Sequence, residues 1–130
     1  MLRTIGFTAV VLAGAVAWAP ALLADAASET VTASTHADLA AAASDLKGVH
    51  THLHHTLNCL VGPGGFGFDA KQLNPCAQSG NGAIPDTTDA AKKAVLQSAA
   101  NKAREGISSS DKWTAKAAAT AAASMLKSAK

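Results

Sequence analysis

Residues 36–60 read HADLAAAASDLKGVHTHLHHTLNCL, and this stretch decides the predicted fold. Apolar residues and two histidines recur in it at alternating steps of three and four, at His36, Leu39, Ala43, Leu46, His50, Leu53, Leu57 and Leu60. Such a seam is typical of a helix that packs one face against other helices. We therefore expect one helix over residues 32–60, with Gly48 costing about 1 kcal/mol relative to alanine.

The rest of the chain predicts two more helices and one long loop. Gly62, Pro63, Gly64 and Gly65 end the first helix, because glycine accepts left-handed backbone and proline cannot continue a helix. Residues 61–85 are rich in Gly, Pro and Asn and should form a loop. Asp86 supplies capping chemistry for an alanine-rich helix over 86–105, and Ser108–Asp111 do so for another over 109–127. With no strand pattern, the sequence predicts an all-α fold, an antiparallel three-helix bundle.

Residues 1–26 have the pattern of an export signal. Arg3 precedes an uncharged apolar run over 5–19, and Ala24-Asp25-Ala26 fits the small-x-small cleavage pattern. The run is shorter than the roughly 20 apolar residues of a spanning helix, which favours cleavage over a membrane anchor. We therefore expect a periplasmic or secreted domain over 27–130, with no membrane span after cleavage.

The two cysteines, Cys59 and Cys76, favour a disulfide in an exported protein. This bridge would tie the long loop to the end of the first helix and would stabilise the fold by about 3 kcal/mol in the chain-entropy model. The alternative is a free Cys59 thiolate that serves as a metal ligand beside the histidines.

Charge and motifs argue against two broad function classes. The formal net charge is +2, and the lysines of the C-terminal half suit solvated faces of alanine-rich helices. They lack interleaved aromatic residues, so we expect no nucleic-acid partner. The chain contains no Gly-x-Ser-x-Gly and no phosphate loop, and a bridged cysteine is no nucleophile, so we expect no enzyme.

The histidines give the strongest functional signal. Four of the five lie within six positions, and neutral imidazole is a common ligand of transition metals. On the wheel of a single helix, His50 and His54 border the leucine seam on the same side as His36. The other pair, His52 and His55, lies nearer Cys59. Each pair needs further ligands, for which Met125, Asp69 and Asp86 are candidates. The predicted metal ligands are His50 and His54, His52 and His55, and His36.

From about Thr32 onward, the histidine-rich, alanine-rich helical pattern resembles the small periplasmic metal-binding helical proteins of Gram-negative bacteria. The chain differs by concentrating histidine on one predicted helix, where those proteins spread it through repeats, and by its Cys59–Cys76 loop. The resemblance supports sequestration or delivery of copper, zinc or nickel.

Two other functions stay open from the sequence. Phe66 and Phe68 lie on the glycine-rich bridged loop, which suits a non-enzymatic envelope interaction or stress module that docks a periplasmic protein partner. The third alternative is haem held non-covalently by histidine, although haem needs a larger apolar pocket than this composition predicts.

Overall fold

A break after Ala42 replaces the single first helix predicted over residues 32–60 with two helices, α1 (Ala26–Ala42) and α2 (Leu46–Val61). The backbone N–H of Ala43 donates to Ala40 O, and α1 ends there. The Asp45 carboxylate then accepts a hydrogen bond of 2.7 Å from the Gly48 N–H and starts α2. As an N-cap, Asp45 has extended rather than helical backbone, so α1 cannot continue through it and the chain reverses here.

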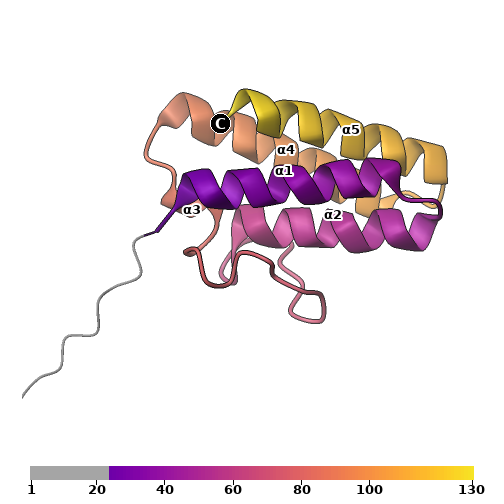
Figure 1. The fold of residues 1–130 in the computed structure, drawn as a ribbon, viewed down its shortest axis with the longest axis horizontal. Helices are drawn as coiled ribbons and strands as arrows, with labels where there is room; N and C mark the ends of the chain where they lie inside the picture. The colour runs from indigo at the N-terminus through magenta and orange to yellow at the C-terminus, as the bar shows by residue number, and fades with distance from the viewer. Residues whose placement is uncertain (1–23) are drawn as a thin grey trace, which may run out of the picture.

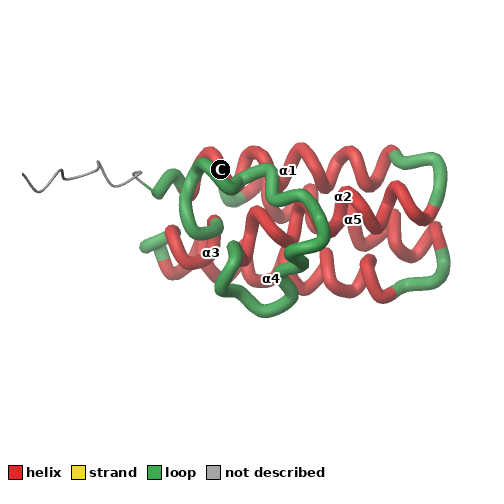
Figure 2. Tube along the Cα trace, turned by 90° about the horizontal axis from the view of Figure 1, so that it is seen from below, coloured by secondary structure: helices red, strands yellow, loops and turns green. Residues whose placement is uncertain are grey.

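The computed structural model describes residues 24–130, and in this part of the chain the predicted all-α class is confirmed. Four long helices form an antiparallel bundle in place of the predicted three (Figure 1). The remaining elements are α3 (Ala83–Asp86), α4 (Ala90–Ser108) and α5 (Lys112–Ser128). The loop between α2 and α3 covers the half of the bundle that carries α3 (Figure 2).

An aspartate caps the N-terminus of each long helix, and each carboxylate accepts from a backbone N–H three residues on. The predicted second cap is wrong by three residues, because Asp89 rather than Asp86 starts α4. The first cap, Asp25, lies within the predicted export signal, of which residues 1–23 are outside the described part of the chain. A chain cleaved after Ala26 would lose this cap, at a cost of about 1 kcal/mol.

Small side chains form most of the bundle core. Alanines from α1, α4 and α5 surround a few large residues, of which Leu53, Leu60 and Leu126 are fully buried. Gly106 follows the helix end predicted at residue 105 but lies inside α4, where an added Cβ would come 2.5 Å from Leu53 Cδ1. Leu39 of the predicted seam is 43% exposed, because the break turns α1 relative to α2. Close helix approach, rather than bulky side chains, therefore fills this core.

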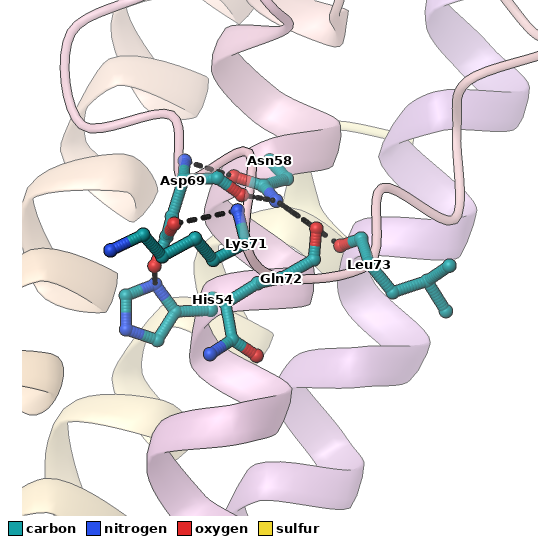
Figure 3. A network of polar contacts seen from close by, with 6 residues as sticks. All are labelled: His54, Asn58, Asp69, Lys71, Gln72 and Leu73. Carbon is teal, nitrogen blue, oxygen red and sulfur yellow. Dashed lines mark hydrogen bonds and ion pairs between the residues drawn. The ribbon is translucent and has the colours of Figure 1, made fainter.

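The predicted Cys59–Cys76 disulfide is present and joins α2 to the long loop. The residue before Cys59 on α2 attaches the loop a second time, through the fully buried side-chain amide of Asn58 (Figure 3). Its Nδ2 donates to Asp69 O at 3.0 Å and to Leu73 O at 3.1 Å, and its Oδ1 accepts from the Asp69 N–H at 2.9 Å. A buried side chain thus satisfies backbone groups that the loop could not satisfy by itself.

Among the described residues, no helix combines the length and the apolar character that a membrane span requires.

Glu29 of α1 is a buried carboxyl group beneath the end of this loop. It is 0% exposed, and its Oε1 accepts from the Gly82 N–H at 2.9 Å. Burial raises the pKa of Glu29 from 4.5 to about 7, and the nearby carboxylates of Asp86 and Asp25 add to the rise despite the hydrogen bond from Gly82. The folded protein therefore holds a proton here that the unfolded chain loses at lower pH.

Replacing Glu29 by glutamine tests this buried proton. Because the folded-state pKa of the acid is raised, Glu29 should cost the wild type stability as pH rises from about 4.5 to about 7. At about 1.4 kcal/mol per tenfold change in proton affinity, the loss is on the order of 3 kcal/mol. Glu29→Gln keeps an acceptor for Gly82 and should remove the loss, as measured by urea unfolding across this range. The exposed control Glu105→Gln should follow the wild type, and parallel profiles for all three proteins would refute the assignment.

Asn58→Leu should leave the loop backbone groups unpaired and destabilise the fold by about 2–4 kcal/mol. The midpoint of urea unfolding, together with limited proteolysis of the loop, measures the effect. The control Gln78→Leu changes an exposed loop residue. Equal stability of the two variants would contradict the role given to Asn58.

Candidate metal centre

Three histidines from two helices converge on one point. His36 lies on α1, and His52 and His55 lie one turn apart on α2. One ring nitrogen of each lies within 4.8 Å of those of the other two. The Nδ1 atoms of His36 and His52 are 3.3 Å apart, and the three ring centroids are separated by 5.0–5.7 Å. We call this set the three-histidine cluster.

The reversal of the chain creates the cluster. His36 lies eight positions before Ser44 and His52 eight positions after it, in the turn between α1 and α2. Because paired antiparallel helices place residues at equal distances from their turn at the same level, the two imidazoles face each other. His55 is three positions beyond His52 and therefore lies on the same helix face.

The spacing of the cluster suits a metal ion. Zinc binds imidazole nitrogen at about 2.0–2.1 Å, so two ligands of a tetrahedral site lie about 3.3 Å apart. The Nδ1 atoms of His36 and His52 already have this separation, and the nitrogen of His55 completes a triangle. Three imidazoles leave a fourth position for water or another ligand.

The surroundings of His36 and His55 favour the neutral imidazole, which is the form that binds metal. Burial lowers the pKa of His36 and of His55, and repulsion between the neighbouring imidazoles lowers both further. The buried Nδ1 of His55 has no hydrogen-bond partner among the described residues. Metal ligation needs the neutral ring, so the lowered pKa values of His36 and His55 favour binding at neutral pH.

The other two histidines have different contacts. His50 Nε2 lies 2.9 Å from Ser109 O and links α2 to the turn between α4 and α5. His54 Nδ1 lies 3.8 Å from Asp69 Oδ2 in the long loop (Figure 3). Burial lowers the pKa of His54, Asp69 opposes that effect, and His50 adds to it. The expectation that His36 lies on the side of His50 and His54 is wrong, because it assumed an unbroken helix.

The extra ligands considered from the sequence do not join the three-histidine cluster. Cys59 is in the disulfide, which rules out the free thiolate in this structure. Asp69 faces His54, Asp86 binds the amides of Asn81, and Met125 packs against the core. The approach of His36 to His52 was missed, although the Asp45 cap and the equal spacing about Ser44 would have indicated it.

Comparison with known proteins gave no match, because no family model, no curated protein and no solved structure is significantly similar to this chain. What the chain does is therefore inferred from its own residues.

The lowered pKa values of His36 and His55 predict a pH-dependent stability of the metal-free protein. As pH falls below 6.5, the unfolded chain takes up protons on these rings before the folded protein does, so these two rings contribute a loss of stability. Relative to the wild type, a His36→Gln/His55→Gln variant should therefore gain stability as pH falls from 7.5 to 5, in urea unfolding with chelator present. Glu29 is common to both proteins and cancels in the comparison. A stability difference between the two proteins that stays constant with pH, or that changes in the opposite direction, would contradict the burial of neutral rings.

Proposed function

We propose that this protein binds one transition-metal ion through His36, His52 and His55, and that it sequesters or delivers copper, zinc or nickel outside the cytoplasm. The convergence of three imidazoles from two helices carries the proposal. An all-imidazole set suits zinc, copper(II) and nickel, whereas thiolates would favour copper(I) and carboxylates harder ions.

The form of the cluster favours transfer of the ion over a purely structural role. Structural zinc sites use four protein ligands, whereas three leave a position through which a partner or a small ligand can exchange the ion. A metal at this point would also join α1 to α2 and stabilise the fold by mass action.

Handling of the ion is favoured over catalysis for a related reason. The groove beneath the long loop and the one beside α3 are lined by other residues. Neither of these two grooves adjoins the three-histidine cluster, so neither would hold a substrate beside a bound ion.

The extracytoplasmic location is part of the proposal. The Cys59–Cys76 disulfide supports it, because such bridges persist in oxidising compartments. The apolar, weakly basic N-terminal sequence supports it independently.

A docking role for the long loop has support from one residue only. Phe66 is 83% exposed, whereas Phe68 is partly buried against the core and helps to hold the loop. Haem is not proposed, because the apolar groove beside Phe66 has no histidine in its lining.

Calorimetric titration with zinc, copper(II) and nickel tests the proposed function. The wild type should bind one ion per chain, and His36→Ala should weaken binding at least about tenfold, because even outer-shell changes at metal sites cost that much. His52→Ala and His55→Ala should do the same. His36 is the sharpest position, since it lies outside the histidine-rich run of α2.

The matched control is His50→Ala/His54→Ala, which removes two imidazoles from the same helix and leaves the cluster intact. It should keep the wild-type stoichiometry and affinity within about threefold. Circular dichroism of each variant establishes that it is folded. Loss of binding in the control with retention in folded His36→Ala would overturn the proposal.

A further inference from the structure

A second binding feature lies away from the histidines, where the long loop meets α4. Here a groove of about 650 Å³ has walls that include Val61, Phe66, Ile84 and Pro85. Its volume lies within the range of small-molecule sites, and such sites are mostly apolar with a few polar groups.

The backbone that forms the rim of the groove is fixed. Gly62 has φ +66°, and an added Cβ there would come 1.6 Å from Asn81 O. The two ends of the loop therefore cross in direct backbone contact, which only glycine permits. With the disulfide and Asn58 holding the middle of the loop, the groove is preformed rather than created by a ligand.

Phe66 and Arg104 form one part of the lining. The Arg104 Nη2 donates to Phe66 O at 2.7 Å, and the guanidinium lies 5.0 Å from the centroid of the Phe66 ring. The Nη1 group of Arg104 donates to Asn101 Oδ1 at 2.8 Å. Arg104 therefore holds an exposed aromatic ring in place as an apolar wall.

The lining also contains a positive charge without an ion-pair partner in the described part of the chain. Lys93 of α4 lines the groove and has no ion-pair partner among the described residues, and no carboxylate is part of the lining. Lys93 and Arg104 are eleven positions apart on α4, a rise of about 16 Å, and lie about three turns apart on the same face of the helix.

We propose that this groove binds a small amphipathic carboxylate, with its apolar chain against Val61, Phe66 and Ile84 and its carboxylate at the Lys93 ammonium. The apolar walls provide affinity through burial of the chain, and the unpaired cation selects an acid over an alcohol of the same length. This site is separate from the three-histidine cluster and does not depend on bound metal.

The test uses octanoate and octanol as probes and follows backbone amide shifts of the purified protein by NMR, with chelator present. Octanoate should bind at least about tenfold more tightly than octanol and shift the amides around Lys93 and Phe66. Lys93→Gln should abolish this preference for the acid while octanol binding stays unchanged. Phe66→Ala should weaken both probes.

Two matched controls keep the test specific. Lys92→Gln removes the neighbouring charge on α4, which does not line this groove, and Leu73→Ala removes another exposed apolar residue of the same loop. Both should bind octanoate like the wild type, as should His36→Ala. Equal affinity for acid and alcohol, or equal losses in Lys92→Gln and Lys93→Gln, would overturn the proposal. Tighter binding of an apolar tripeptide with a free C-terminus would assign the groove to peptide ends instead.

Discussion

The reversal of the chain between Ala42 and Leu46 is the constraint on which the rest of this structure depends. It is held locally by the Asp45 cap of α2 and from across the bundle by two lysines of α5. Lys116 Nζ donates to Ala43 O at 3.0 Å and Lys112 Nζ to Ser44 O at 3.3 Å, so the carbonyls at the end of α1 are satisfied by cations. The turn then aligns α1 with α2 along their whole length. At one level of this pair lies the three-histidine cluster, and at the far end lie the disulfide and Glu29.

Much of the fold could be predicted from the sequence, and the main wrong prediction, a single helix in place of α1 and α2, has a specific cause. The all-α class, the disulfide and the long loop all follow from local signals, namely alanine content, an even cysteine count and clustered glycine and proline. The break between α1 and α2 does not follow from local signals, because the steps of three and four continue from Ala43 to Leu46 without interruption. The alanine run before the break also favours a continuous helix. Asp45 can also act as the N-cap of a new helix. Tertiary packing decides whether the first helix continues or a second one begins.

The candidate site shows the same limit. The histidine-rich run was recognised, but its division into two faces was drawn on a single helix, so His36 was placed with His50 and His54. Once the chain reverses, His36 meets His52 and His55 instead, and His50 binds a backbone carbonyl as an ordinary packed histidine. The part played by Asn58 was also missed, since nothing in a sequence distinguishes a buried amide that organises a loop from an exposed one.

The two proposed sites divide the molecule by chemistry. The helices α1 and α2 bring three imidazoles together, and the loop and α4 form an apolar groove with the ammonium group of Lys93. The central claim concerns the first of these, and anomalous diffraction from zinc-loaded crystals tests it most directly. The account predicts one anomalous peak between His36, His52 and His55, with zinc–nitrogen distances of about 2.0–2.1 Å. A peak at His54 and Asp69, or at His50, with none between the three histidines, would contradict it.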